Sequence, residues 1–334
     1  MTEVMSELPL AVTFDALTDV GFWTSVGILA GVYTLVALGL QLNVGFTGIV
    51  NFGQAGFMAI GAYSMAILTV DTGISFYLSL PISILITVAF GLLVGLPALR
   101  LREDYLAIAT IAMAETVRLV ALNARELTGG NLGFSCSDDG SKCFDEAWLN
   151  ISDTIEGWLE ALGWSNPESL FPLFLVVWAA VVLLTLALRG ITFTPWGRVL
   201  RAIREDEDAA RALGKNAFVY KLQSLAISAS VAAVAGWFLA LNIAAVAPTE
   251  FEPLVTFFAY AVLILGGLAS YWGLIVGSVI LWTLLELTRF IDLPLDNVQI
   301  AALRFAIVGL VLILLMAFRP QGAFGKREEL VLGD

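Results

Sequence analysis

Hydrophobic residues in this chain form long runs that charged residues seldom interrupt. The run 169–188, "SLFPLFLVVWAAVVLLTLAL", has the roughly 20 mostly apolar residues that a helix needs to cross the hydrocarbon core of a bilayer. The runs do not alternate between apolar and polar residues, as the strands of a membrane β-barrel would. The pattern therefore predicts an all-α, polytopic membrane protein.

About nine of these runs are predicted to be transmembrane helices, and the pattern also allows eight or ten. Each is close to the length of a membrane-crossing helix. The predicted spans are Val20–Leu42, Ile49–Val70, Phe76–Leu99, Tyr105–Leu122, Ser169–Leu188, Leu222–Val246, Leu254–Tyr271, Leu274–Phe290 and Ile300–Phe318.

The basic residues between the spans indicate the orientation of the chain. Lys and Arg accumulate on the cytoplasmic side of membrane proteins. Here they follow the third span, fill the segment between the fifth and the sixth, and follow the ninth. Nine spans place all three groups on one side, so we expect the N-terminus outside and the C-terminus in the cytoplasm. The groups are Arg100 and Arg102; Arg189, Arg198, Arg201, Arg204, Arg211, Lys215 and Lys221; and Arg319, Lys326 and Arg327.

The composition agrees with a membrane protein and limits the metal-binding and catalytic chemistry that the chain can perform. Hydrophobic residues make up 59% of the chain and charged residues 14%, whereas about a quarter of a soluble domain is charged. The first 19 residues contain no Lys or Arg, so we expect the first span to act as its own insertion signal. With no histidine and two cysteines, the chain is expected to hold no metal and no catalytic residue.

The longest connection, residues 123–168, is predicted to be an acidic extracytoplasmic loop. Its acidity fits either the solubility of an exposed loop or a docking surface for a soluble partner. The segment "WLNISDTIEGWLEALGW" (148–164) has apolar residues at helical spacing and predicts an interfacial or docking helix. Cys136 and Cys143 lie in the same loop, where an oxidising compartment would favour a disulfide over two free thiols.

One cytoplasmic stretch, residues 194–216, carries its own helix signals. Thr194 suits the cap, Pro195 suits the first helical position, and Gly214 suits the position just past the end. Apolar residues recur at helical spacing between these signals, which gives the predicted helix one apolar stripe. That stripe consists of Leu200, Ile203, Ala210 and Leu213.

The same stretch is densely charged with both signs. Arg201 and Arg204 are placed to pair with Glu205 or Asp208 across one helical turn. A helix lying on the inner leaflet is the alternative, but four consecutive acidic residues oppose it because that membrane surface is negative. A single amphipathic helix that inserts into a protein groove is therefore expected.

Part of this helix resembles a known docking element. Asp208, Ala209 and Ala210, followed after three residues by Gly214, resemble the Glu-Ala-Ala-x-x-x-Gly element of ATP-binding cassette (ABC) importer permeases, which docks on the ATPase subunit. Further stretches resemble branched-chain amino-acid ABC permeases, in the same order along the chain, and are closer to their M-type than to their H-type subunit. They are "NVGFTGIVNFGQAGFMAIGAY" (43–63), "LTGGNLGF" (127–134), "LGGLASYWGLIVGS" (265–278) and "FRPQGAFG" (318–325).

The resemblance implies one permease domain over residues 1–334, in the plasma (inner) membrane, that imports branched-chain or other neutral amino acids. It implies a second, H-type permease subunit, two ATP-binding subunits, an extracytoplasmic amino-acid-binding protein and surrounding lipid, and no nucleic acid. ATPase coupling is expected through residues 198–214, above all Arg201, Arg204, Glu205, Asp208, Ala209, Ala210 and Gly214.

The sequence contains no Gly-x-x-x-x-Gly-Lys-Ser/Thr phosphate loop, since "GKN" at 214–216 lacks the upstream glycine and the hydroxyl. The chain is therefore expected to be no enzyme and to bind no cofactor. ATP and magnesium belong to partner subunits in this interpretation.

Polar residues inside the spans are candidates for a translocation path. Asn43, Asn51 and Gln54 stand among glycines, where a broken helix would offer free backbone groups to a zwitterion. Close helix packing through small residues explains the same glycines. Glu115 precedes Arg118 by three residues, so a structural ion pair and a place on the path both stay open.

Two other kinds of transporter also fit the pattern. An ABC permease for urea, amides or sugars would share the architecture. An ion-coupled secondary transporter would need internal inverted repeats and an ionisable coupling residue, for which Glu115 is the candidate. A membrane anchor of a redox complex is disfavoured because the chain has no histidine to ligate haem.

Overall fold

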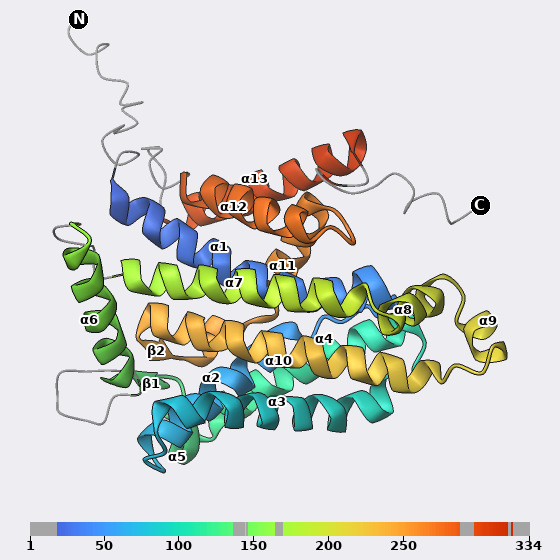
Figure 1. Ribbon diagram of the computed structural model, residues 1–334, viewed down its shortest axis with the longest axis horizontal. Helices are drawn as coiled ribbons and strands as arrows, with labels where there is room; N and C mark the ends of the chain where they lie inside the picture. The colour runs from blue at the N-terminus through green and yellow to red at the C-terminus, as the bar shows by residue number, and fades with distance from the viewer. Residues whose placement is uncertain are drawn as a thin grey trace, which may run out of the picture.

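The computed structural model describes residues 19–135, 144, 146–163, 170–287, 297–319 and 322. Its long helices run side by side along one axis, with shorter helices across the two ends (Figure 1). The elements are α1 (Val20–Leu40), the π-helix η2 (Gln41–Thr47), α2 (Gln54–Val70), α3 (Phe76–Ala98), α4 (Glu103–Asn123), α5 (Arg125–Thr128), β1 (Phe134–Ser135), α6 (Glu146–Ala161), α7 (Phe171–Thr192), α8 (Pro195–Glu205), α9 (Glu207–Ala212), α10 (Ala217–Ile243), β2 (Ala245–Val246), the 3₁₀ helix η3 (Pro248–Phe251), α11 (Pro253–Gly266), α12 (Tyr271–Leu287) and α13 (Asn297–Phe318).

The all-α expectation is confirmed, and the count of nine spans is not. Within the described residues, five helices are long and apolar enough to cross a membrane. The count becomes six if α11 and α12, which meet at an angle of 118°, form one broken span. Every predicted span overlaps a helix, but α2, α11 and α12 are each shorter than a full crossing helix.

The second predicted span begins later than its apolar run suggests. The first span continues past Leu40 as the π-helix η2, which gives an apolar stretch of 28 residues from Val20 to Thr47. Gly48 ends η2 with a φ of 75°, a left-handed conformation that suits glycine. Residues 49–53 are not helical, and α2 starts only at Gln54. The chain therefore turns back into the bundle as an irregular segment.

The centre of the bundle consists of α1, α2 and α10, and α10 packs against both α1 and α2. Two glycines allow α2 and α10 to approach closely. A Cβ on Gly61 would overlap the backbone of Ala233, and one on Gly236 would overlap the carbonyl of Met58. Small residues at helix crossings serve this purpose in membrane proteins.

We expect Gly236→Ala to destabilise the folded protein by about 1–3 kcal/mol or more, because overpacking forces helices apart. Thermal unfolding of the purified protein in detergent measures the effect. Gly309→Ala is the matched control, since an added Cβ there meets nothing within 4 Å. Equal melting temperatures for the two variants would contradict this account of the α2–α10 contact.

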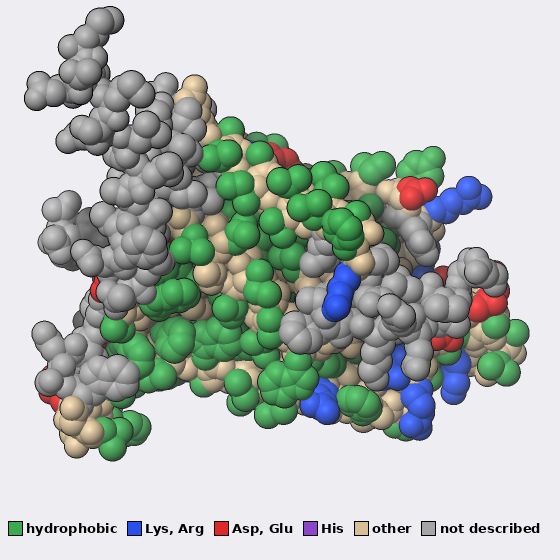
Figure 2. Space-filling view, turned by 90° about the horizontal axis from the view of Figure 1, so that it is seen from above, with side chains coloured by type: hydrophobic (Ala, Val, Ile, Leu, Met, Phe, Trp, Pro, Cys, Tyr) green, Lys and Arg blue, Asp and Glu red, His purple; other side chains and the backbone are tan. Residues whose placement is uncertain are grey.

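Basic side chains gather at one end of the bundle, the arginine end, which holds Arg100, α8 and α9. The Arg100 guanidinium lies 5.8 Å from the ring centroid of Phe218 at the start of α10. Figure 2 shows Lys and Arg side chains at this end and hydrophobic side chains over the middle of the same face. This grouping agrees with the positive-inside pattern of the sequence.

The opposite end, the loop end, carries the connection between α4 and α7. There β1 pairs antiparallel with β2, with Phe134 opposite Val246. The predicted helix of residues 148–164 is confirmed as α6, which lies across this end of the bundle (Figure 1). Its Trp148 is buried, whereas Trp158 is 70% exposed. Cys136 and Cys143 lie outside the described residues, so their disulfide stays a prediction.

Candidate functional site

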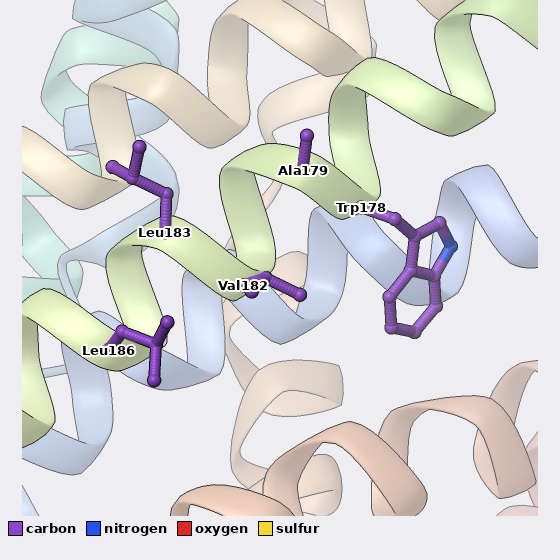
Figure 3. Close-up of a pocket in the computed structure, with 5 residues that line it drawn as sticks. All are labelled: Trp178, Ala179, Val182, Leu183 and Leu186. Atoms are coloured by element: carbon purple, nitrogen blue, oxygen red, sulfur yellow. The ribbon is translucent and has the colours of Figure 1, made fainter.

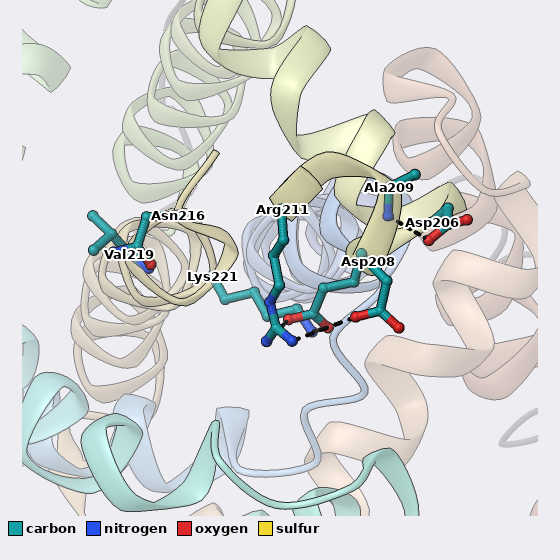
Figure 4. A network of polar contacts seen from close by, with 8 residues as sticks. Asp206, Asp208, Ala209, Arg211, Asn216, Val219 and Lys221 are labelled. Atoms are coloured by element: carbon teal, nitrogen blue, oxygen red, sulfur yellow. Dashed lines mark hydrogen bonds and ion pairs between the residues drawn. The ribbon is translucent and has the colours of Figure 1, made fainter. Parts of the chain in front are cut away.

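The charged stretch at the arginine end forms two helices, so the prediction of a single helix over 194–216 is wrong. α8 ends at Glu205, and Asp206 adopts an extended conformation with φ −153° and ψ 103°. The Asp206 carboxylate then accepts a hydrogen bond from the amide of Ala209 at 2.9 Å, which caps α9 (Figure 4). An aspartate is a strong N-cap, and this preference outweighs continuation of α8. Pro195 begins α8 as predicted, but the Thr194 hydroxyl donates to Ile191 instead of capping.

The end of the stretch follows the sequence signal. Gly214 has a φ of 79°, its amide donates to Arg211, and the amide of Lys215 donates to Ala210. These two bonds form the Schellman motif that commonly ends a helix at glycine. The connection from α9 to α10 is thus a defined turn.

The two alanines of the docking element face opposite ways. Ala210 is 3% exposed and packs with Ile203 and Ala217 of this chain. Ala209 lies on the exposed side beside Asp208. Ala210 therefore joins the two-helix projection formed by α8 and α9 to α10. Ala209 is the alanine that another protein could approach closely. Leu200 and Ile203 of the predicted stripe are buried, whereas Leu213 is 82% exposed and does not belong to it.

Ion pairs stabilise α9, and one of them joins it to the start of α10. Arg211 binds Glu207 at 2.5 Å, and Lys221 binds the other carboxylate oxygen of Glu207 at 2.6 Å. Arg211 also approaches Asp208 at 3.5 Å, although the Asp208 carboxylate is 93% exposed (Figure 4). Three residues of the acidic run, Asp206, Glu207 and Asp208, therefore cap α9 or form its ion pairs. The fourth, Glu205, is exposed.

Arg201 and Arg204 do not make the predicted pairs with Glu205 or Asp208. The Arg201 guanidinium donates to the carbonyl of Thr192 at 3.0 Å and lies 5.5 Å from the ring centroid of Phe46. Arg204 donates to the carbonyl of Gly45 in η2. Both bonds join a cation to a backbone carbonyl, and such charge-assisted bonds are stronger than neutral ones.

We call this contact the arginine junction: Arg201 and Arg204 of α8, Gly45, Phe46 and Gly48 around η2, Thr192 of α7 and Tyr271 of α12. Phe46 stacks on Tyr271 with 5.6 Å between ring centroids, and the Tyr271 and Thr192 hydroxyls are 3.0 Å apart. Gly48 fits closely, since a Cβ there would lie 3.0 Å from Cγ of Arg204. α8 is therefore anchored to the π-helix that precedes the irregular segment 49–53.

The irregular segment 49–53 crosses the polar centre of the bundle, and side-chain hydroxyls take up its backbone groups. The Tyr260 hydroxyl accepts from the amide of Asn51 and donates to its carbonyl, at 3.1 and 3.0 Å. Thr110 accepts from the amide of Phe52, and Thr256 accepts from that of Ala55 at the start of α2. Buried backbone groups need such partners.

The three amide candidates for a path lie inside this centre. Asn43, Asn51 and Gln54 are each 0% exposed. Gln54 bonds to Asn51 and Ser228, and the Asn43 side chain accepts from Ser224. Three of the backbone groups that the sequence suggested for a zwitterion, the Asn51 amide and carbonyl and the Phe52 amide, are already bound in this conformation. The amides hold the broken helix in place, and a role on the path would require the centre to open.

Thr256→Val is expected to lower the stability of the protein by about 1–3 kcal/mol, since the buried amide of Ala55 would lose its acceptor. Chemical or thermal unfolding of the purified protein measures the loss. Thr116→Val is the control, because that hydroxyl is exposed and bonds only to Ala112 in its own helix. A variant as stable as this control would show that the segment does not depend on the hydroxyl.

The pairing of Glu115 with Arg118 is confirmed. The two side chains form a bidentate contact with N–O distances of 2.9 and 2.6 Å. The pair lies midway along α4 on an outward face, with 35% of the Glu115 side chain and 19% of the Arg118 side chain exposed. Charges at such a depth avoid hydrocarbon and face protein or water.

A different outward face lies on α7. Trp178, Ala179, Val182, Leu183 and Leu186 line a shallow apolar hollow there (Figure 3). The N–H of the Trp178 indole donates a hydrogen bond to the carbonyl of Gly27 at 3.1 Å, inside the bundle. The side chains of the hollow therefore present a hydrocarbon surface. This face fits contact with lipid chains, in contrast to the charged face of α4.

Sequence reasoning missed the residues that organise the centre. Thr110, Thr256 and Tyr260 are single hydroxyls within apolar runs, and their partners lie 58 to 209 residues away in the sequence. Their only signal is a polar group at a position that a span would bury.

These features define the class of protein. Long apolar helices surround the hydrogen-bonded polar break at residues 49–53. The projection of α8 and α9 is anchored next to that break, at one end of the bundle. The molecule is a polytopic membrane protein built like a transport subunit. The family model described as "Branched-chain amino acid transport system / permease component" matches residues 24–316. The chain belongs to this family.

Individual relatives agree with the family assignment. The high-affinity branched-chain amino acid transport system permease protein LivM of Escherichia coli K12 is 34% identical, over 94% of this chain and 72% of that protein. A probable LivM permease of Methanocaldococcus jannaschii is 29% identical over 89% of this chain and 91% of that protein. LivH of Escherichia coli K12 is 24% identical over 90% and 93%. No solved structure matches the chain significantly.

The chain is thus an M-type permease subunit and a multi-pass protein of the plasma membrane. As a permease component it is non-catalytic, and ATP hydrolysis takes place in separate subunits.

Proposed function

We propose that this chain forms part of the translocation path of an ATP-driven importer for branched-chain or other neutral amino acids. The observation that carries the proposal is the arginine junction, which ties the α8–α9 projection to η2 and so to the broken helix at the polar centre. A movement imposed on α8 would displace η2 directly. The names of the LivM relatives support the substrate class.

The ATPase contact is proposed on the outer side of the projection. Asp208, Ala209 and Gly214 are exposed there, and Glu205 is exposed at the end of α8. Ala209 lets a partner surface come close, while the acidic side chains fix its register more than they add affinity. Arg201, Arg204 and Ala210 act from within, since they bind this chain.

The proposed assembly contains a second, H-type permease, two ATPases that hold ATP and magnesium, and an extracytoplasmic binding protein. The arginine end would face the cytoplasm, with the loop end outside. The outward face of α4 with Glu115 is proposed to face the second permease and the path. α6, with its exposed Trp158 and acidic residues, is the proposed contact for the binding protein.

Site-directed crosslinking tests the ATPase contact. Both native cysteines are replaced by serine, and Ala209→Cys is introduced into the assembled complex. We expect crosslinks to the ATPase subunit that depend on the nucleotide state. Gly190→Cys, on an open surface of α7, is the control and should not crosslink. Crosslinks from residue 209 to lipid alone would reject the docking role.

The same architecture would serve urea, amides or sugars, and uptake assays with a panel of solutes separate these from amino acids. Ion-coupled secondary transport is the other alternative. It has less support, because Glu115 is already paired with Arg118 on its own helix.

A further inference from the structure

A cavity of about 200 Å³ lies among α1, α10, η3, α11 and α12, on the loop-end side of the polar centre. Part of its wall is aliphatic, with Leu29, Leu239 and Val255 from three different helices. Ile243 and Leu254 add to this aliphatic part, and the rest of the wall is aromatic, acidic and, at Thr249, a hydroxyl. The cavity is distinct from the buried amide cluster of Asn51 and Gln54, and the proposed function gives it no role.

Three aromatic rings form one side of the cavity. The centroid of Tyr33 lies 4.7 Å from that of Trp282 and 6.3 Å from that of Phe258, and the latter two are 6.4 Å apart. Tyr33 is 6% exposed, and its hydroxyl forms no hydrogen bond with another described residue. This hydroxyl is therefore available to a molecule in the cavity.

Two carboxylates complete the lining. Glu250 is half-buried in η3, and Glu252 follows at the start of α11. Among the described residues no Lys or Arg forms a direct ion pair with either, although the charge of Arg118 on α4 interacts with that of Glu252. Burial, and after it the negative charge of Glu252, hold the pKa of Glu250 above its ordinary value. Glu250 is thus a partly buried carboxylate with no cation paired to it, which is unfavourable, and a bound cation would relieve it.

We propose that this cavity binds the ammonium group of a neutral amino acid, with Glu250 and the rings of Tyr33 and Trp282 around the cation and the aliphatic wall around the side chain. This inference rests on the proposed function, because it names a holding place for the imported solute. Carboxylates and aromatic faces together attract organic cations.

The lining distinguishes an organic ammonium ion from a metal ion. Calcium takes six to eight oxygen ligands, and magnesium takes six. The cavity offers two carboxylates and few other oxygens, and most of its wall is hydrocarbon or aromatic. A cation attached to an apolar body satisfies both parts of this wall.

Equilibrium binding to the assembled complex in nanodiscs, without the binding protein, tests the site. The probes are leucine, 3-methylbutylamine, which keeps the ammonium group, and 4-methylpentanoate, which lacks it. We expect the first two to bind and the third not to bind. Glu250→Gln should weaken both binding ligands by about tenfold or more, and Tyr33→Phe should weaken them less. Glu126→Gln, an exposed carboxylate on α5, is the control and should bind as the parent does.

Binding of 4-methylpentanoate as tightly as the amine, no binding of leucine to the parent complex, or unchanged affinity in Glu250→Gln would each overturn the inference. If Glu250→Gln does not fold, unchanged affinity in Tyr33→Phe overturns the inference in its place. ATP-driven leucine uptake with the binding protein is measured in parallel. Normal uptake with unchanged binding in Glu250→Gln would reject the cavity site alone, whereas a parent complex that imports no amino acid would reject the proposed function.

Discussion

Arg204→Ala is expected to uncouple ATP hydrolysis from import, with uptake lowered at least about tenfold while the complex stays assembled and hydrolyses ATP. The Arg204 guanidinium is the direct link from α8 to the carbonyl of Gly45 in η2. A hydrogen bond to a charged group contributes about 1.5–3 kcal/mol, and a transmitted movement needs such a fixed contact. Coupling is measured as the ratio of the uptake rate to the ATPase rate of the reconstituted complex.

Two further variants sharpen this test. Arg198→Ala removes the same charge from an exposed position of α8 and should leave coupling intact. Gly48→Ala should reproduce the uncoupling, because its Cβ would press on Arg204 and its positive φ is strained for alanine. If Arg198→Ala and Arg204→Ala lose coupling equally, the effect comes from charge and not from the junction.

Removing the charge of Glu115 is expected to have the second largest effect. Glu115→Gln leaves Arg118 without its carboxylate midway along α4, where a lone charge is costly. We expect uptake to fall by about tenfold, which corresponds to about 1.4 kcal/mol. Leucine uptake by the reconstituted complex and the yield of assembled protein are measured together.

The double variant Glu115→Leu with Arg118→Leu separates the two roles of the pair. Replacing an ion pair by apolar residues is often neutral or stabilising for the fold, so assembly should be retained. Uptake should stay low if the face of α4 lines the path or the second permease. Full recovery of uptake would mean that the pair only stabilises α4, and Glu115 would no longer be a path candidate.

The helices could be predicted from the sequence because apolar runs and cap residues are local signals. Every predicted span overlaps a helix, and the turn at Gly214 follows its glycine. The break at Asp206 was missed, although the signal was present: an aspartate three residues before Ala209 caps a new helix. The length of the apolar run also predicted a helix from residue 49, where the chain is irregular. A buried run can be irregular when side chains form hydrogen bonds with its backbone.

The partners of the charged residues could not be predicted in the same way. Arg204 binds a carbonyl 159 residues earlier in the chain, and Tyr260 binds Asn51 across 209 residues. Helical spacing favoured local pairs for Arg201 and Arg204, but the end of α7 and η2 lie against α8 and offer carbonyls with no competing charge. Local pairing was correct for Glu115 and Arg118, which lie one turn apart on the same helix.

We propose that this chain is part of the membrane path of an ATP-driven amino-acid importer, coupled through α8 and α9. The most direct measurement is uptake of labelled leucine by proteoliposomes that contain the chain with its H-type partner and both ATPases, with the binding protein on the outside. The account predicts uptake that requires ATP inside and is lost in Arg204→Ala. Leucine uptake driven by a sodium or proton gradient without ATP would contradict it.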